Sequence, residues 1–259
     1  MEYEIYNRDC LEGMKEIDDK SIDLILTDLP YNITNATWDK KAIDLNELWE
    51  QFKRIIKPTS SVLLFASSSF TYKLYNSNPE WYKYKWVWVK NTSTGFPNAK
   101  NRPMCKYEEI LVFSDGVIIH KDKSERRMKY NPQNLKKCNK LCGGQKAGNI
   151  YSDHNGSLSH TYTQQFCNYP NDILQFKRPN NLRQKHPTEK PVPLLEYLIR
   201  TYTNKGETVL DATMGSGSTG VAAVNTGRKF IGFEIEKKFY EIAEQRIKKA
   251  SAVFLQELF

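Results

Sequence analysis

Short apolar runs alternate with helical patterns through the first 113 residues and again after residue 185. Apolar runs bounded by polar turns predict strands at residues 3–7, 21–27, 61–66, 84–89, 110–113, 207–212 and 230–234. Apolar residues at three- and four-residue steps predict helices at 44–57, 71–75, 194–202, 218–226 and 239–250. Strands that alternate with helices usually form a parallel sheet covered by helices on both faces. We therefore predict an α/β fold with a doubly wound, mostly parallel, seven-stranded sheet.

The alternation stops between about Ser114 and Lys185, where aliphatic residues are few and Lys, Asn, Gln, Gly and Ser are many. A segment with so little apolar surface cannot build a core of its own. We expect residues 114–185 to be an insertion that rests on a main domain made of residues 1–113 and 186–259.

The composition is that of an intracellular globular protein. A chain of 259 residues suits one large domain with a sizeable insertion. No stretch approaches the roughly 20 apolar residues that cross a bilayer, and Met1-Glu2-Tyr3-Glu4 lacks the features of a signal peptide. Five scattered cysteines, an odd number, favour a reducing compartment. We expect a cytoplasmic protein without a membrane partner.

Positive charge is concentrated in one part of the chain. The 38 Lys and Arg residues against 30 Asp and Glu leave a net charge of +8. Residues 115–190 alone contain fourteen basic and six acidic side chains, which is also +8, so the rest of the chain is neutral as a whole. A basic surface can serve solubility alone, but such a concentration favours a polyanionic partner, and we expect nucleic acid.

Residues 28–31, Asp28-Leu29-Pro30-Tyr31, directly follow a predicted strand. In open α/β sheets, ligands bind at the carboxyl ends of the strands. The carboxylate can accept hydrogen bonds, the proline constrains the turn and the aromatic ring can stack. These four residues therefore suit a flat group that carries an amine, and a plain surface turn is the alternative interpretation.

A glycine-rich turn follows the strand at 207–212. Gly215, Gly217 and Gly220 have the G-x-G-x-x-G spacing between a predicted strand and a predicted helix. Glu234 comes nineteen residues after Gly215, at the end of the next strand, where an acid can bind ribose hydroxyls. This combination predicts a nucleotide-like cofactor, and glycines needed only for a tight turn are the alternative.

Two cofactor classes fit this turn. A nicotinamide dinucleotide would place its pyrophosphate at the helix N-terminus, whereas S-adenosylmethionine carries no phosphate. Asp211 lies inside the turn that would face a pyrophosphate. An acid there suits the cationic methionine end, so the sequence favours S-adenosylmethionine.

Three segments together resemble the amino-group DNA methyltransferases that act on adenine N6 or cytosine N4. Residues 28–31 are similar to the family's catalytic D/N/S-P-P-Y/F/W motif and residues 211–219 to its D-P-F-x-G-S-G-T-T cofactor loop. Residues 186–191, His-Pro-Thr-Glu-Lys-Pro, are similar to the H-P-T-x-K-P segment that precedes that loop. This order of motifs is that of the β class. The resemblance covers about residues 3–113 and 186–250, and it implies a circularly permuted Rossmann-like fold with a target-recognition insertion at 114–185.

The resemblance implies a role for each matching residue. The Asp28 side chain and the Leu29 carbonyl would hold the exocyclic amine of a flipped base while Tyr31 stacks on it. Asp9 would bind the adenine amine of S-adenosylmethionine, Glu234 its ribose hydroxyls and Lys190 its methionine carboxylate. The predicted catalytic residues are Asp28, Leu29, Pro30 and Tyr31. The predicted cofactor-binding residues are Asp9, Cys10, Asp28, Lys190, Asp211, Met214, Gly215, Ser216, Gly217, Ser218, Thr219 and Glu234.

Two positions depart from the family pattern. Leu29 replaces the first proline of the catalytic motif, although its carbonyl, the atom that the chemistry uses, remains. Ala212-Thr213 stands where Pro-Phe is usual in the cofactor loop. The aromatic contact to the cofactor's adenine is therefore not expected, and Met214 is its partial replacement.

The resemblance also implies the target and the partners. Aspartate at the head of the catalytic motif indicates adenine, since the cytosine enzymes usually carry serine there. We expect a prokaryotic or phage-encoded enzyme that methylates adenine N6 in a specific duplex DNA sequence, with cytosine N4 as the alternative. A homodimer and a companion restriction endonuclease are partners that the family allows, and neither has a signature in the chain.

Other interpretations stay open at this point. A nicotinamide-dependent oxidoreductase explains the glycines alone, a methyltransferase for RNA or a protein amide uses related loops, and a DNA-binding module with a decayed site would keep the basic insertion. Cys138 and Cys142 with His154 and His160 come close to a Cys2His2 zinc spacing, but the gap is short and the apolar residues of a finger are missing. We expect no metal site.

Overall fold

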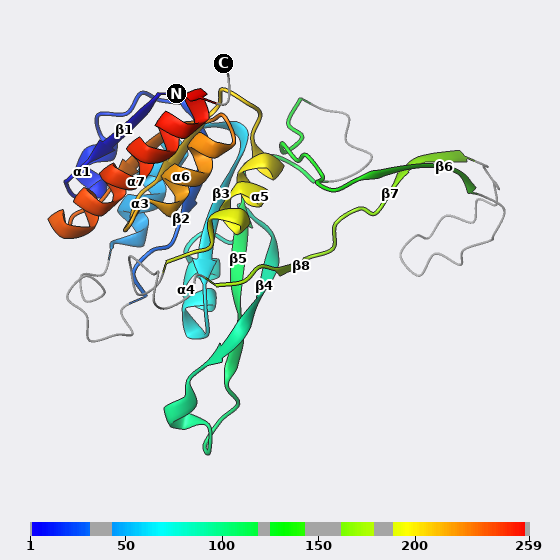
Figure 1. Ribbon diagram of the computed structural model, residues 1–259, viewed down its shortest axis with the longest axis horizontal. Helices are drawn as coiled ribbons and strands as arrows, with labels where there is room; N and C mark the ends of the chain where they lie inside the picture. Colours follow the sequence, from blue (N-terminus) through cyan, green and yellow to red (C-terminus); the bar gives the residue numbers. More distant parts are fainter. Residues whose placement is uncertain (1, 32–42, 119–124, 143–161, 179–188, 257–259) are drawn as a thin grey trace. The chain divides into compact units, whose positions relative to one another are not determined.

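The computed structural model describes residues 2–31, 43–118, 125–142, 162–178 and 189–256 (Figure 1). They form two compact units, one of Met1–Asn131 with Asp172–Phe259 and one of Pro132–Asn171. His154 and His160, like residues 32–42 and 186–188, lie outside the described residues. None of the described helices is long and apolar enough to cross a membrane.

The first unit is built on one sheet, which has eight strands within the described residues. Across the sheet the strands are β1 (Tyr3–Tyr6), β10 (Lys229–Phe233), β9 (Thr208–Asp211), β2 (Ile22–Thr27), β3 (Ile56–Ala66), β5 (Cys105–Phe113), β4 (Tyr82–Thr94) and β8 (Ile173–Gln175). Seven of them are the predicted strands, and the three-residue β8 adds an edge next to β4. The predicted fold class, an α/β protein with a mostly parallel Rossmann-like sheet, is confirmed.

Strand direction changes only towards one side of this sheet. The ladder from β1 through β10, β9 and β2 to β3 is parallel, and β5 is antiparallel to both β3 and β4. Between β2 and β9 the strand order reverses, since the chain continues from β2 to β3 on one side and from β9 to β10 on the other. Ligands bind at such switch points in open α/β sheets.

Helices cover both faces of the sheet, as the alternation predicts (Figure 1). They are α1 (Cys10–Met14), α3 (Leu45–Ile55), α4 (Ser69–Ser77), α5 (Val192–Tyr202), α6 (Ser218–Asn225) and α7 (Lys237–Gln256). A short 3-10 helix, η1 (Phe96–Asn98), lies between β4 and β5 and buries no residue. Buried residues of α5, α6 and α7 share one core cluster with alternate side chains of the strands, and those of α1, α3 and α4 share the other. Since successive side chains of a strand point to opposite faces, each strand supplies both cores.

The helix over 44–57 ends earlier than its pattern predicts. Asp44 caps α3 by accepting hydrogen bonds from the backbone N–H groups of Asn46 and Glu47. The chain then becomes strand β3 at Ile56, ahead of Pro58, because Ile56 already pairs with Ile22 of β2. Pairing with a neighbouring strand decides this boundary, and local sequence cannot show it.

Strands β4 and β5 are longer than predicted and form a hairpin beyond the edge of the helices (Figure 1). Along β4 the buried positions alternate through Trp86, Trp88 and Lys90. The lysine therefore occupies an inward position of the same period-two pattern.

The second unit is a two-stranded antiparallel sheet of β6 (Lys136–Cys142) and β7 (Tyr162–Cys167). It lies within the predicted insertion 114–185, and residues on both sides of it pack in the first unit. Before it, Asn131 donates backbone and side-chain hydrogen bonds to the carbonyls of Thr201 and Thr203 at the end of α5. After it, β8 pairs with β4. The chain is thus fastened to the first unit on either side of Pro132–Asn171.

Candidate active site

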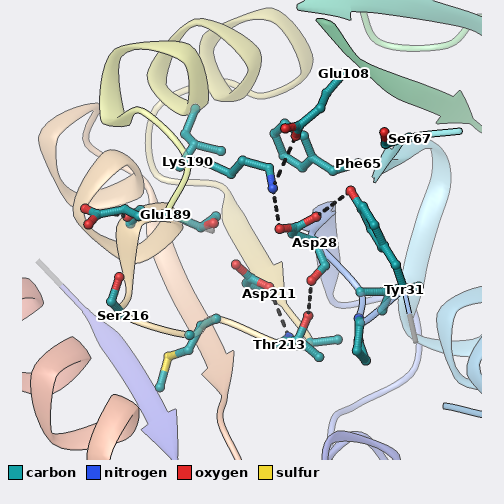
Figure 2. A pocket seen from close by; sticks show the side chains of 18 of the residues that line it. Asp28, Tyr31, Phe65, Ser67, Glu108, Glu189, Lys190, Asp211, Thr213 and Ser216 are labelled. Carbon is teal, nitrogen blue, oxygen red and sulfur yellow. Dashed lines mark hydrogen bonds and ion pairs between the residues drawn. The ribbon is translucent and has the colours of Figure 1, made fainter. Parts of the chain in front are cut away.

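A cavity of about 440 Å³ opens at the carboxyl ends of the parallel strands in the first unit (Figure 2). All but one of the predicted site residues line it. They are Asp9, Cys10, Asp28, Leu29, Pro30, Tyr31, Lys190, Asp211, Met214, Gly215, Ser216, Ser218, Thr219 and Glu234. We call the side formed by the ends of β1, β9 and β10 the cofactor half, and the side formed by β2, β3, β4, β5 and Lys190 the target half.

Gly217, the exception, shapes the turn from the side of the core. Its φ of +78° lies in the left-handed region, and a Cβ there would approach the Ala243 Cα and Cβ atoms of α7 within 3 Å. Only glycine fits both demands, so Gly217 lets α6 begin directly after the turn.

Backbone N–H groups fix the carboxylates of the cofactor half. Glu234 accepts hydrogen bonds from the N–H groups of Gly215 at 2.9 Å and Glu236 at 2.7 Å. Asp9 caps α1 by accepting from Leu11 N–H, and Asp211 accepts from Thr213 N–H at 3.1 Å. A carboxylate oxygen has two lone-pair positions, so Glu234 can still accept from hydroxyl groups that face the cavity.

Burial sets the proton affinities in this half. Asp211 is 3% exposed, and its burial raises the pKa to about 6 despite hydrogen bonds that oppose the change. Burial together with the charge of Asp9 raises the pKa of the Cys10 thiol to about 12. Cys10 is therefore a neutral side chain at physiological pH and not a nucleophile.

The cofactor half suits a ribose and a cation better than a pyrophosphate. Three carboxylates, Asp9, Asp211 and Glu234, surround the glycine turn. The guanidinium of the nearby Arg246 of α7 donates to the Ser216 carbonyl and forms an ion pair with Glu189. A pyrophosphate would bring its negative charge close to these acids and would be repelled by them. The residues present therefore fit S-adenosylmethionine.

At the target half, Asp28 directly follows β2 and faces the cavity (Figure 2). Its Oδ1 accepts from the Tyr31 hydroxyl at 2.9 Å, and its Oδ2 accepts from the Lys190 ammonium. The Tyr31 ring lies 4.6 Å from that of Phe70, which supports it from α4. Burial raises the pKa of Asp28; Lys190 opposes this and Glu108 adds to it, with a net rise.

The two predicted motifs are joined by Thr213. Its hydroxyl donates to the Asp28 carbonyl at 3.0 Å and lies 2.9 Å from the Thr27 hydroxyl. Thr213 stands where the family pattern has an aromatic residue, so this departure links the catalytic turn to the cofactor loop. Leu29, the other departure, is 3% exposed and packs with the core under the catalytic turn.

Lys90 and Glu108 were not predicted as site residues, and both line the cavity. Lys90 Nζ lies 3.2 Å from Glu108 Oε1, and Lys190 Nζ lies 3.5 Å from Glu108 Oε2. Charges of alternating sign therefore run from Lys90 through Glu108 and Lys190 to Asp28. Figure 2 shows the last three of these residues. The one sequence signal for them is a lysine at an inward position of a strand, where charge is costly unless paired.

The structure places the Lys190 ammonium on Asp28 and next to Glu108, both at the target half. Burial lowers its pKa, but the charges of Asp28 and Glu108 outweigh that effect and hold the pKa above its usual value. Lys190 is therefore protonated.

A permuted Rossmann-like sheet, an acid-lined glycine turn and an Asp–Pro–Tyr turn around one cavity define the class of S-adenosylmethionine-dependent amino methyltransferases. The chain belongs to the DNA methylase family, whose model for N6 and N4 enzymes matches residues 22–245. It is thus a DNA methyltransferase of the N6/N4 type.

Relatives from several bacteria cover almost the whole chain. The DNA adenine methyltransferase YhdJ of Escherichia coli (strain K12) is 29% identical, over 98% of this chain and 85% of that protein. The type II methyltransferase M.HpaI of Haemophilus parainfluenzae is 24% identical, over 95% of this chain and 74% of that protein.

Solved structures show the same fold. The M1.HpyAVI–SAM complex superposes with a TM-score of 0.62 at 26% identity and covers 94% of this chain and 99% of its own. The cytosine-N4-specific PvuII DNA methyltransferase has a TM-score of 0.65 at 18% identity, with 99% and 92% covered.

Proposed function

We propose that this protein transfers a methyl group from S-adenosylmethionine to the exocyclic N6 of an adenine flipped out of a specific duplex DNA sequence. The observation that carries the proposal is the Asp28 carboxylate, which faces a cavity shared with the acid-lined glycine turn. Aspartate at this position favours adenine over cytosine, and the relative YhdJ is named a DNA adenine methyltransferase.

The chemistry requires an activated amine. The lone pair of an aromatic exocyclic amine is delocalised into the ring, which makes its nitrogen a poor nucleophile. Asp28 and the Leu29 carbonyl accept its two N–H bonds and draw the nitrogen towards tetrahedral geometry. Bound S-adenosylmethionine would supply the methyl group, and the electron pair of its S–C bond would stay on sulfur as the nitrogen forms its new bond to carbon. Asp28 then holds the surplus proton, which suits a carboxylate whose burial raises its pKa.

The cofactor half binds and orients S-adenosylmethionine, which supplies an electrophilic methyl group when bound. Glu234 accepts from the ribose hydroxyls and Asp9 binds the adenine amine, both in orientations that backbone N–H groups already fix. Asp211 faces the cationic end, and Met214 packs beside the glycine turn. Preorganised groups of this kind supply most of the rate gain in a direct transfer.

We propose that the basic residues of 114–185 bind the DNA. The unit Pro132–Asn171 carries lysines on β6, and we assign target recognition to it and its flanks. Extrusion of the base costs a few kcal/mol, which contacts with Tyr31 and Asp28 offset. A companion restriction endonuclease, which the type II names of relatives suggest, stays a prediction. So do a homodimer and a cytoplasmic location.

One experiment tests the proposal directly. Purified protein is incubated with duplex DNA and S-adenosylmethionine carrying a labelled methyl group, and the digested nucleosides are separated. We expect label in N6-methyladenine at one sequence context. Label in N4-methylcytosine would replace the adenine assignment with the alternative, and label in RNA or protein but not in DNA would overturn the proposal.

A further inference from the structure

Lys190 is shared between two carboxylates at the target half (Figure 2). Its ammonium donates to Asp28 Oδ2 and lies 3.5 Å from Glu108 Oε2. Among the described residues, no donor makes a hydrogen bond to Glu108 Oε2, although this oxygen is buried. Since a buried acceptor without a donor is costly, Glu108 offers Lys190 a second place to bind.

Asp28 is a weakened acceptor in this arrangement. Its Oδ1 accepts from Tyr31 and its Oδ2 from Lys190. Each oxygen keeps a second lone-pair position, but an oxygen that binds an ammonium is a weaker acceptor for a neutral amine, because the cation neutralises its charge. Asp28 therefore holds an exocyclic N–H more strongly when the bond from Lys190 lengthens.

Glu108 is held in place to receive the lysine. It lies opposite Trp88 in the antiparallel β4–β5 pair, and Lys90, whose side chain is 3% exposed, fixes its Oε1. Burial raises the pKa of Glu108, but Lys190 and Lys90 outweigh it and bring the pKa below its usual value. The Phe65 ring, 4.9 Å from Lys190 Nζ, offers a face that attracts a cation in either position.

The charged groups around the two carboxylates allow this exchange of the lysine. Around Asp28 they are Lys190, Glu108, Tyr31 and Asp211, and around Glu108 they are Lys190, Lys90 and Arg178. Because Lys190 moves between two carboxylates that are already there, the exchange brings no new charge into the cavity.

We propose that Glu108 is a positioning residue that takes Lys190 over from Asp28 when the target amine enters the site. Lys190 returns to Asp28 when the methylated base leaves. This inference rests on the proposed methylation of an exocyclic amine. It assigns Glu108 a role in the methyl-transfer step and none in cofactor binding.

The test compares Glu108→Gln with Glu109→Gln. Glu109 is the next residue on β5 and equally an acid, but it pairs with Lys85 and Thr71 and does not line the cavity. We expect Glu108→Gln to lower the single-turnover methylation rate by about a hundredfold, the scale of a small misplacement at a reacting centre. Calorimetry should show S-adenosylmethionine affinity unchanged, and Glu109→Gln should leave the rate at the wild-type level.

The pH profile separates this role from a structural one. Glu108 raises the pKa of Asp28 by its negative charge, so its loss must lower that pKa. The acidic limb of the rate profile should shift to lower pH in Glu108→Gln, although the plateau falls. A fallen plateau with an unmoved limb means that Glu108 only supports the fold, and this overturns the inference.

Two further variants keep the inference open to refutation. Glu108→Asp keeps the negative charge but moves it away from Lys190, because its side chain is shorter. This variant takes the place of Glu108→Gln if Glu108→Gln does not fold. A wild-type methylation rate in whichever variant folds overturns the proposal. In Lys190→Met, adding Glu108→Gln should cause no further loss of rate, because Glu108 acts through Lys190. A wild-type protein that methylates no nucleic acid contradicts the proposed function, whereas active wild type with fully active Glu108→Gln contradicts this inference alone.

Discussion

The two halves of the cavity hold their carboxylates by different means. In the cofactor half, backbone N–H groups bind Glu234 and Asp9, and Asp211 accepts from the backbone N–H of Thr213 as well as from the side chains of Thr219 and Thr27. In the target half, Asp28 is held by two side chains, Tyr31 and Lys190. Backbone donors cannot rotate away, whereas a lysine can. The cofactor half is therefore preorganised for a constant ligand, and the target half keeps its acid protected until a base replaces the lysine.

Removal of the Asp28 carboxylate should have the largest effect on the methylation rate. Asp28→Ala should lower the methylation rate by about a thousandfold, because it removes the acceptor for both the N–H bond and the proton. Affinity for S-adenosylmethionine, measured by calorimetry, should change less than about threefold, since the cofactor half is intact. A variant that binds the cofactor and methylates DNA at the wild-type rate would contradict the role of Asp28.

The buried, ionised Asp211 carboxylate should lower the free energy of unfolding when the cofactor is absent. Its pKa is about 6 in the folded protein and about 3.9 in an unfolded chain. The folded state then binds the proton more tightly, so the free energy of unfolding falls as the pH rises from about 4 to about 6 and stays low above it, by about 3 kcal/mol. Asp211→Asn should therefore stabilise the cofactor-free protein at pH 7.5 while weakening cofactor binding.

Urea unfolding at pH 4.5 and pH 7.5 measures this effect. The wild type should lose more stability between the two values than Asp211→Asn, and the difference between the two proteins isolates one group from the many others that titrate. Equal pH dependence in both proteins would show that Asp211 does not have a raised pKa.

Glu234→Gln sharpens the comparison from the cofactor side. The variant keeps one acceptor oxygen but loses the charge that two backbone N–H groups bind. A hydrogen bond to a charged group contributes about 1.5–3 kcal/mol, so the dissociation constant for S-adenosylmethionine should rise by roughly ten- to a hundredfold. The rate at saturating cofactor should stay within about threefold of wild type, and a large fall there would mean that the halves are not separate.

Thr213→Val tests the link between the halves and should have the smallest effect. It removes the hydroxyl that donates to the Asp28 carbonyl and keeps the shape of the side chain. Loss of one neutral hydrogen bond is worth about 1 kcal/mol, or about fivefold in the methylation rate. Thr213→Ser, which retains the hydroxyl, is the matched control and should be less affected.

Sequence alone predicted candidate residues that lie at the ends of predicted strands. Asp28 directly follows one predicted strand, and Asp211 and Glu234 lie at the ends of two others, so the parallel sheet brings all three to one edge. Glu108 and Lys90 were missed because their pairing crosses two antiparallel strands, and the pattern predicted only the apolar parts of those strands. The contact of Thr213 with Asp28 joins positions far apart in the chain, and only the folded sheet shows it.

The insertion shows the same limit of local patterns. Its strands β6 and β7 contain a single aliphatic residue, Leu141, and β8 is only three residues long, so periodicity did not reveal them. Tyr130 and Phe176 pack against Tyr202 and Tyr197 of α5. The sequence that this segment is proposed to recognise depends on side chains at the surface, and no internal packing pattern encodes that.

The fastening of the chain at Asn131 and at β8 has a consequence for how such enzymes diversify. Both attachments lie outside residues 132–171, so a replacement of that segment would keep them. We therefore expect that residues 132–171 can be replaced as a unit without disturbing the sheet that positions the active-site residues. New sequence specificities could arise by recombination at these two junctions, and a laboratory chimera joined at the same junctions should retain the catalytic rate of the parent.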